Sequence, residues 1–205
     1  MNLFPIFLKL AGRRCLVIGA GPVGESKIEG LLLAGADVRV VDPRATRAVR
    51  AWARAGKICW EARSFDPADL GGMFLVVAAT SSAELHEEIF QEARRRGILC
   101  NIVDDPARCD LYYPAVVRRG HLQIAISTGG RSPALAQHLK KELEKQFGPE
   151  YETWVEQLGQ ARRKLMARGI APERRRRLLH RLASRQAFEA FLGRQKVAGS
   201  RRQRP

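Results

Sequence analysis

Short apolar runs alternate with amphipathic segments through the first hundred residues. Residues 14–18 (RCLVI), bounded by Gly19, have the apolar, β-branched character of a buried strand. Further strands are predicted over 38–42, 57–61, 73–80 and 98–104, and helices between Gly24 and Gly35, over 46–55 and over 81–97. Alternation of short strands and helices is typical of a parallel sheet with helices on both faces. We therefore expect an α/β, Rossmann-like domain.

The pattern changes after residue 104. Residues 105–120 predict a loop leading into a strand, and residues 121–128 (HLQIAIST) alternate apolar and polar positions, which leaves one face open to solvent or to a partner. Ser132 and Pro133 are the residue types of a helix N-cap and a first helical position. The helix that they begin carries an apolar stripe at four-residue spacing, expected to pack against a core or a second subunit: Leu135, Leu139, Leu143 and Phe147.

The C-terminal quarter differs from the rest in charge. The net charge is +15, and residues 151–205 hold 15 Lys+Arg against 4 Asp+Glu, whereas the first 150 residues hold 21 against 17. The chain after Gly148 is predicted to be helical, ending in a solvated tail over 194–205. A basic segment attracts nucleic acid, anionic lipid or an anionic small molecule. Residues 172–194 have the apolar positions of a docked helix and no recognised nucleic-acid motif, so we expect no nucleic-acid partner.

No apolar run is long enough to span a membrane, and the charges at the N-terminus follow the apolar stretch instead of preceding it as in a secretory signal. We expect a cytoplasmic protein with no membrane partner. Its cysteines form no CxxC pair and no His lies at zinc spacing from them, so we expect reduced thiols and no metal site. Cys109, in a polar loop, is the best candidate for a reactive thiol.

Residues 19–24 (GAGPVG) form a GxGxxG loop between the first strand and the first helix. In this context Gly19 allows the tight turn, Gly21 lets the backbone approach a pyrophosphate, and Gly24 allows close packing of helix on strand. Backbone amides of the first helical turn, Val23 among them, point toward the phosphates with the helix dipole behind them, and Pro22 is predicted to lie in the same cofactor site. The loop therefore predicts a dinucleotide site.

A dinucleotide site needs an acidic residue at the end of the second strand, and this chain has one there. Asp42 ends the second strand, 18 residues beyond Gly24, and can accept hydrogen bonds from both ribose hydroxyls of an adenosine. Its charge would repel a 2′-phosphate, which favours NAD over NADP, although Arg44 could pair with such a phosphate. Pro43 and Arg44 are predicted to flank the adenosine, and Thr80 to meet the nicotinamide half. The alternative is a nucleotide-fold domain that binds no dinucleotide.

A second group of polar residues follows the fifth strand. Asp104 ends this strand at the carboxyl edge of the sheet, where doubly wound folds place their ligands, and a carboxylate there can act as a general base. Residue type alone favours a simpler role, in which Asp104 and Asp105 cap a turn before Pro106.

At this point the chain resembles a known family. The segments FPIFLKLAGRRCLVIGAGPVGESKIEGLLLAGADVRVV and NIVDDPARCDLYYPAVVRRGHLQIAISTGGRSPALA are similar to the NAD-dependent precorrin-2 dehydrogenases of sirohaem synthesis. These include stand-alone bacterial enzymes, a yeast dehydrogenase/ferrochelatase and the N-terminal module of trifunctional sirohaem synthase. The likeness covers roughly residues 3–147, and its two motifs occur together in order.

The resemblance implies oxidation of precorrin-2 to sirohydrochlorin with NAD as acceptor, in a homodimer, and it implies that the aspartate matching Asp104 is catalytic. It also implies three parts: an NAD-binding domain over 1–113, a dimerisation segment over 114–147 and a helical domain over 148–193, before the basic tail. Thr128 matches a serine near the tetrapyrrole in the trifunctional module. The predicted substrate-binding set is Ser127, Thr128, Gly129, Gly130, Arg131, Ser132 and Arg119.

Three other functions remain open from the sequence. A dehydrogenase that is also a sirohydrochlorin ferrochelatase would use Asp104 to take protons from ring nitrogens. A non-catalytic NAD-sensing domain would need only the glycine loop and Asp42. A nucleic-acid function of the basic C-terminus would show as salt-dependent DNA retention that is lost on removing residues 172–205.

Overall fold

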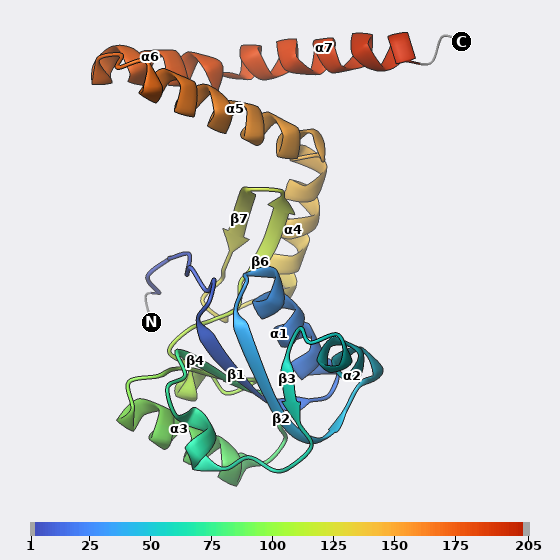
Figure 1. The fold of residues 1–205 in the computed structure, drawn as a ribbon, viewed down its shortest axis with the longest axis vertical. Coiled ribbons are helices and arrows are strands. Elements are labelled where there is room, and N and C mark those ends of the chain that lie inside the picture. Colours follow the sequence, from blue (N-terminus) through green and yellow to red (C-terminus); the bar gives the residue numbers. More distant parts are fainter. Residues whose placement is uncertain (1–2, 203–205) are drawn as a thin grey trace. The chain divides into compact units, whose positions relative to one another are not determined.

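The computed structural model describes residues 3–202 of the chain, with side chains described up to Gln195. The chain divides into two compact units, Met1–Tyr113 and Pro114–Pro205, called here the N-terminal and C-terminal units (Figure 1).

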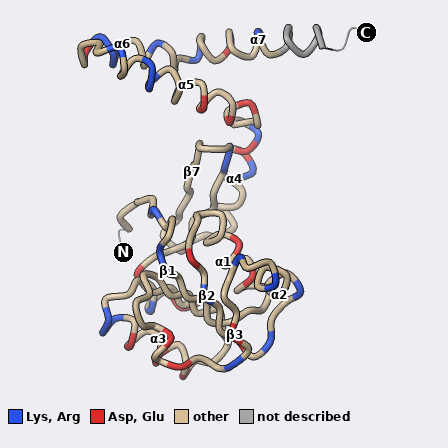
Figure 2. The backbone as a smooth tube through the Cα atoms, in the orientation of Figure 1, with Lys and Arg blue, Asp and Glu red and all other residues tan. Residues whose placement is uncertain are grey.

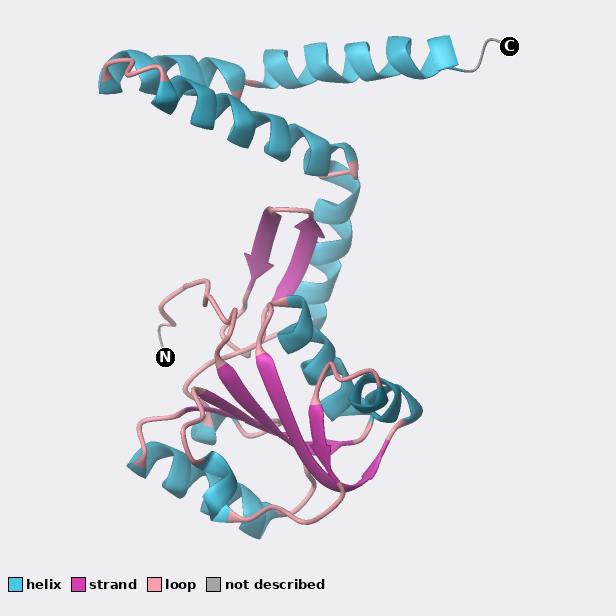
Figure 3. Ribbon diagram, viewed as in Figure 1, coloured by secondary structure: helices cyan, strands magenta, loops and turns pink. Residues whose placement is uncertain are grey.

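The N-terminal unit is built on a five-stranded parallel sheet in the order β3-β2-β1-β4-β5 (Figure 3). Its strands are β1 (Arg14–Ala20), β2 (Asp37–Ala45), β3 (Cys59–Glu61), β4 (Leu75–Ala78) and β5 (Leu99–Ile102). Its helices are α1 (Pro22–Leu33), α2 (Arg47–Arg54) and α3 (Ala83–Arg95), with short 3-10 helices η1 (Pro67–Leu70) and η2 (Pro106–Arg108). The predicted Rossmann-like fold is confirmed, with the order reversing at β1 and β4.

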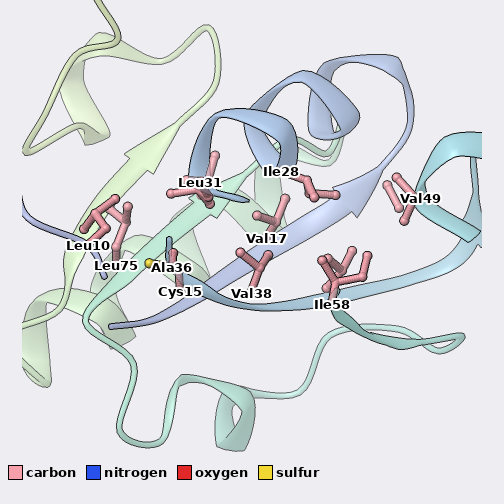
Figure 4. Close-up of a cluster of buried hydrophobic side chains, with 13 residues drawn as sticks. Leu10, Cys15, Val17, Ile28, Leu31, Ala36, Val38, Val49, Ile58 and Leu75 are labelled. Carbon is pink, nitrogen blue, oxygen red and sulfur yellow. The ribbon is translucent and has the colours of Figure 1, made fainter. Parts of the chain in front are cut away.

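Alternate residues of the central strands form two buried clusters on opposite faces of the sheet. Cys15 and Val17 of β1 belong to the first cluster, which α1 and α2 cover through Ile28, Leu31 and Val49 (Figure 4). Leu16 and Ile18 belong to the second, which α3 covers through Ile89 and Ala93. Strands buried on both faces read as continuous apolar runs, which is why RCLVI and LVVA carry so few polar residues.

Two features of this unit were not predicted. β2 runs past Asp42 to Ala45, because Ala45 pairs with Ala20 after a register shift that leaves residues 42–44 outside the regular ladder. The helix η1 was missed, although Asp66 and Asp69 form a reciprocal capping box around it. The register shift and the capping box each involve only a few residues, so the alternation of strands and helices is unchanged.

The C-terminal unit begins with the antiparallel hairpin of β6 (Ala115–Arg119) and β7 (Leu122–Ile126). The helices α4 (Pro133–Gln146), α5 (Glu150–Ala167), α6 (Pro172–Leu182) and α7 (Arg185–Arg202) follow. The predicted cap is confirmed, since the Ser132 hydroxyl accepts a hydrogen bond from the Leu135 amide and Pro133 begins α4. The tail predicted over 194–205 begins inside α7, which continues to Arg202, and residues 203–205 lie outside the described residues.

An aromatic cluster forms the packed part of the C-terminal unit. Tyr151 and Trp154 of α5 contact Phe188 of α7, with ring centroids 4.5 and 5.7 Å apart, and Trp154 also contacts Phe191. The apolar stripe of α4 is only partly covered within this chain: Leu135 is 48 % exposed, and Leu139, Leu143 and Phe147 are half-buried. The buried residue of the helix, Ala136, lies beside the stripe. Figure 2 shows the basic residues of this unit gathered along α6.

Candidate functional site

Glycine suits each of the three positions of the loop after β1 for a different physical reason. Gly19 has φ +103°, and a Cβ there would lie 2.3 Å from the backbone oxygen of Ala79 at the end of β4. A Cβ on Gly24 would lie 2.0 Å from the backbone oxygen of Gly19, so α1 packs directly on the loop. A Cβ on Gly21 would meet nothing within 4 Å. Two glycines therefore close the turn, and the third leaves open space beside the backbone.

That open space lies at the N-terminus of α1. Gly21 is the N-cap and provides no side chain to bond the first amides, and Pro22, the first helical residue, has no amide hydrogen. The next amides, beginning at Val23, have no partner within the helix and carry the positive end of its dipole. This cradle fits a dinucleotide pyrophosphate, which it would hold through backbone N–H groups.

Asp42 joins the glycine loop to the end of β2. One of its carboxylate oxygens accepts a hydrogen bond from the Ala20 amide at 2.7 Å, and the other accepts from the Arg44 amide at 2.8 Å. The Asp42 carbonyl accepts from the Trp60 indole at 3.0 Å, which holds the residue in place from β3. Each carboxylate oxygen keeps a second lone pair for a ribose hydroxyl. Pro43 and Arg44 are exposed beside it.

Thr80 follows β4 on the same edge of the sheet. Its hydroxyl accepts a hydrogen bond from the Ser82 amide at 3.2 Å, and its carbonyl accepts one from Nε2 of His86 at 2.8 Å. His86 lies on α3, four residues after the Ser82 cap, and sequence analysis missed it. The spacing from the cap was the available signal, because it places residue 86 over the first turn of the helix.

Asp104 lies just beyond β5 at the same carboxyl edge. It is exposed, and it is the one non-glycine residue of the described chain with positive φ, at +63°. Aspartate tolerates this left-handed conformation better than most residues, at a cost of about 1 kcal/mol. Strain of this kind concentrates at functional sites. The structure thus separates the two acids: Asp104 is exposed, and Asp105 supports the turn through its ion pair with Arg108.

The loop from Asp105 to Leu111 is held firmly against β5. Asp105 forms an ion pair with Arg108, which lowers the pKa of Asp105, and Arg108 also reaches Glu87 of α3 at 2.6 Å. The Asn101 side chain donates to the Leu111 carbonyl at 2.9 Å. These contacts fix the loop, and they therefore fix the position of the neighbouring Asp104.

Cys109 is not an activated nucleophile. Its thiol lies 3.1 Å from the carbonyl oxygens of Ile102 and Asp105, and burial raises its pKa. Burial also raises the pKa of Cys15 to about 11 and of Cys100 to about 12. These thiols are protonated at neutral pH and unreactive. The described residues include no group of three or more His, Cys, Asp or Glu side chains that could hold a metal ion.

The predicted substrate-binding turn lies in the C-terminal unit, between β7 and α4. The Ser127 hydroxyl accepts from the Gly129 amide at 3.1 Å, and the Thr128 hydroxyl accepts from the Ser132 amide at 3.0 Å. Gly129 and Gly130 both have positive φ, at +61° and +79°. Together with the N-terminus of α4 this places polar groups and backbone amides around one exposed turn that carries Arg131.

Arg119 does not belong to that turn. Its guanidinium donates to the carbonyls of Phe147 at 2.8 Å and Glu144 at 3.1 Å, so it caps the C-terminal end of α4. The turn lies at the other end of this 14-residue helix, about 20 Å away at 1.5 Å per residue. Unpaired carbonyls and the negative end of the helix dipole explain why a cation sits there.

Comparisons with known proteins identify the family to which the chain is similar. A family model described as putative NAD(P)-binding matches residues 6–115, and a second, described as sirohaem biosynthesis protein central, matches residues 119–146. Siroheme synthase 1 of Pectobacterium atrosepticum is 40 % identical over 182 residues, covering 89 % of this chain and 38 % of that protein. Siroheme synthase 1 of Aeromonas salmonicida is 38 % identical over 184 residues, covering 90 % and 39 %.

The chain therefore spans less than half the length of these curated relatives. A solved structure, SirC, precorrin-2 dehydrogenase, aligns with a TM-score of 0.77 and 26 % identity, over 90 % of this chain and 91 % of that one. The glycine loop, Asp42 and Asp104 all fall inside the range of the first family model. The first family model covers more than half of this chain, and the match to the central segment of sirohaem biosynthesis proteins follows it. The chain therefore belongs to the family of putative NAD(P)-binding proteins.

Proposed function

We propose that this protein is an NAD-dependent dehydrogenase that oxidises precorrin-2 to sirohydrochlorin. The observation that carries the proposal is the combination of an open phosphate cradle at Gly21 with an exposed, left-handed Asp104 on the same edge of the sheet. The alignment with SirC, precorrin-2 dehydrogenase, over nearly the whole of both chains supports the choice of substrate.

In the proposed reaction precorrin-2 loses a hydride and a proton. Asp104 would accept the proton, and the glycine loop and Asp42 would hold NAD, which would supply the hydride acceptor. The chain needs no nucleophile for this chemistry, and its remaining task is orientation. Thr80 follows β4 and is proposed to contact the nicotinamide half of bound NAD.

The preference for NAD rests on Asp42. Its carboxylate is fixed by two backbone amides and, within the described residues, forms no ion pair that would neutralise its charge. A 2′-phosphate placed beside it would meet an uncompensated negative charge.

The tetrapyrrole is a polyanion, since acetate and propionate groups surround its rim. The turn of Ser127, Thr128, Gly129, Gly130, Arg131 and Ser132 is proposed to bind one of these carboxylates. Free amides at the start of α4 and the exposed Arg131 suit an anion. Arg119 is left out of this set because its donors already bond the end of α4.

A homodimer formed through residues 114–147 is part of the proposal. The hairpin of β6 and β7 is a two-stranded sheet, and its strand β7 leaves Leu122, Ile124 and Ile126 only half-buried. The helix α4 packs on this hairpin, mainly on β6, and a second subunit along the edge of β7 would cover what α4 leaves exposed. Light scattering measures the mass: Ile124→Lys is expected to give monomers, whereas Gln123→Lys, on the exposed face, leaves the dimer intact.

Other proposed properties concern the location and the partners. Among the helices that the structure describes, none combines the length and apolarity that a bilayer crossing requires. A cytoplasmic location and the lack of nucleic-acid or membrane partners remain predictions, tested by cell fractionation and by retention on DNA and on anionic vesicles.

The decisive experiment is an anaerobic assay with precorrin-2 and NAD, followed by the tetrapyrrole spectrum and by NADH absorbance. Wild-type protein is expected to form sirohydrochlorin and NADH in equal amounts, and Asp104→Ala is expected to lose this activity. Asp37→Ala, at the amino end of β2, is the matched control. NAD binding without turnover would leave an NAD-sensing domain instead, and chelation of added iron or cobalt would reveal the bifunctional enzyme.

A further inference from the structure

We propose that His86 is a positioning residue of the cofactor site: its ring fixes Thr80, so that the Thr80 hydroxyl donates a hydrogen bond to the nicotinamide half of NAD. The inference rests on the placement of Thr80 in the proposed function. It adds a residue, and a direction of hydrogen bonding, that the sequence motifs do not indicate.

The backbone that follows β4 is held by β1 as far as Ala79. Ala78 is the last residue of β4 that pairs with β5. The Ala79 amide donates to the Ile18 carbonyl at 2.7 Å, and a Cβ on Gly19 would lie 2.3 Å from the Ala79 oxygen, so the two backbones are in close contact. Thr80 comes next, beyond the paired strand, and its carbonyl needs a partner from elsewhere.

The start of α3 supplies the two contacts that hold Thr80. The half-buried His86 ring donates from Nε2 to the Thr80 carbonyl at 2.8 Å, and the Ser82 amide donates to the Thr80 hydroxyl at 3.2 Å. His86 can reach back to Thr80 because side chains on a helix lean toward its N-terminus. A carbonyl only accepts hydrogen bonds, so Nε2 must carry a hydrogen.

These contacts determine what Thr80 can offer a ligand. One lone pair of its hydroxyl oxygen is occupied by the Ser82 amide, and its carbonyl already accepts from His86. Among the hydrogen bonds of the described residues, none uses the hydroxyl hydrogen of Thr80. A threonine hydroxyl has one hydrogen to donate. Thr80 therefore presents a fixed donor, which suits an oxygen atom of the nicotinamide riboside.

The first test compares the affinities for NAD and ADP by calorimetric titration. His86→Leu removes the donor to Thr80, and NAD affinity is expected to fall about fivefold, the effect of one hydrogen bond. ADP lacks the nicotinamide riboside, and its affinity is expected to be unchanged, because Ala79 stays bonded to β1 and the glycine loop is intact. Unchanged NAD affinity, or an equal loss for ADP, overturns the proposal.

Two further variants separate the hydrogen bond from the stability of α3. His86→Gln carries an amide that can donate in place of Nε2, and it is expected to restore wild-type NAD affinity. Phe90→Leu, one turn further along α3 and packed against the same core, is expected to leave NAD affinity unchanged. A failure of His86→Gln to restore affinity, or an equal loss in Phe90→Leu, overturns the proposal. A melting curve confirms that each variant is folded.

The next test asks whether His86 acts through Thr80. Thr80→Val removes the hydroxyl, and in this background His86→Leu is expected to cause no further loss of NAD affinity. A fivefold loss from His86→Leu in both backgrounds would show that His86 acts by another route, and it would overturn the proposal.

Nitrogen NMR of the histidine rings tests the contact itself in the protein without cofactor. Nε2 of His86 is expected to carry a hydrogen. A ring protonated at Nδ1 alone cannot donate from Nε2 to the Thr80 carbonyl, and this result overturns the proposal.

The outcomes separate the role of His86 from the proposed function, because none of these measurements uses a tetrapyrrole. If the wild type binds NAD but does not oxidise precorrin-2, the proposed reaction fails, and the measured affinities still decide the role of His86. If the wild type binds no NAD, both proposals fail.

Discussion

The two units differ in how much of their apolar surface they bury themselves. In the N-terminal unit both faces of the sheet carry a continuous cluster of buried side chains. In the described part of the C-terminal unit the buried hydrophobic residues are Ala115, Val117, Ala136, Trp154 and Phe191. The N-terminal unit therefore has a core of its own, whereas the stability of the C-terminal unit depends more on what covers it.

The comparison also separates two kinds of site. The cofactor cradle and Asp104 are set on strand ends whose positions are fixed by the buried core. The turn before α4 is held by its own hydroxyl-to-amide hydrogen bonds. Changes to the first site should therefore affect folding and binding together, and changes to the second should remain local.

The largest effect is expected from Gly19→Ala. The added Cβ would lie 2.3 Å from the Ala79 oxygen at a positive φ, so the variant is expected to lose more than about 3 kcal/mol of unfolding free energy and to lose NAD binding. Gly129→Ala in the other unit also has positive φ but meets no atom within 4 Å, and about 1 kcal/mol is expected. Urea unfolding and NAD titration measure both, and equal losses would contradict the comparison.

Core truncation sharpens the difference in burial. Ile28→Ala removes a fully buried side chain in the N-terminal unit and is expected to cost about 3 kcal/mol. Leu135→Ala, 48 % exposed on α4, is expected to cost under about 0.5 kcal/mol in the monomer. Thermal melts over a range of protein concentration decide the point: a concentration-dependent loss for Leu135→Ala would place that side chain in a subunit interface.

Asp42→Ala tests the cofactor site without touching the core. It removes the ribose acceptor and the hydrogen bonds to the amides of Ala20 and Arg44, and NAD affinity is expected to fall about tenfold. NADP affinity should fall less, because the repulsion of the 2′-phosphate disappears as well. Calorimetric titration with both cofactors measures the ratio, which Asp37→Ala should leave unchanged. A variant that loses affinity for both cofactors equally would argue against the role of Asp42 in discrimination.

Arg119→Met tests the reassignment of that residue. It removes the donors that cap α4, and about 1 kcal/mol of local stability is expected to be lost around β6 and α4, with NAD affinity intact. Hydrogen exchange of these segments is the measurement, and the exposed neighbour Arg118→Met is the control. A higher KM for precorrin-2 with unchanged exchange would return Arg119 to the substrate site.

The smallest effect concerns pH. The Arg63 guanidinium bonds Asp69, which is almost fully buried, and lowers the pKa of that carboxyl. A pKa lowered by folding stabilises the protein above the unfolded value of about 3.9, and this stabilisation is lost as pH falls through the folded value. The melting temperature of wild type is therefore expected to fall more steeply below pH 4 than that of Asp69→Asn. Parallel curves would exclude this contribution.

Local signals explain what could be predicted. Gly19, Gly21 and Gly24 are required by backbone geometry within one turn, and Ser132 with Pro133 marks a helix start through contacts three residues apart. The apolar strands were recognisable because both faces are buried. Asp42 and Asp104 were found because each follows such a strand, and parallel strands bring their carboxyl ends to one edge.

The sequence by itself determined the α/β architecture of the first unit and the position of its cofactor loop, because these depend on the periodicity and residue types of short segments. Only the tertiary structure decided that Lys27 meets Tyr113, that His86 bonds Thr80, that Asp104 takes a left-handed conformation, and that Arg119 caps a helix. These contacts join residues whose approach depends on how whole elements pack, and a side chain's charge or hydrogen-bonding capacity does not specify which distant partner satisfies it.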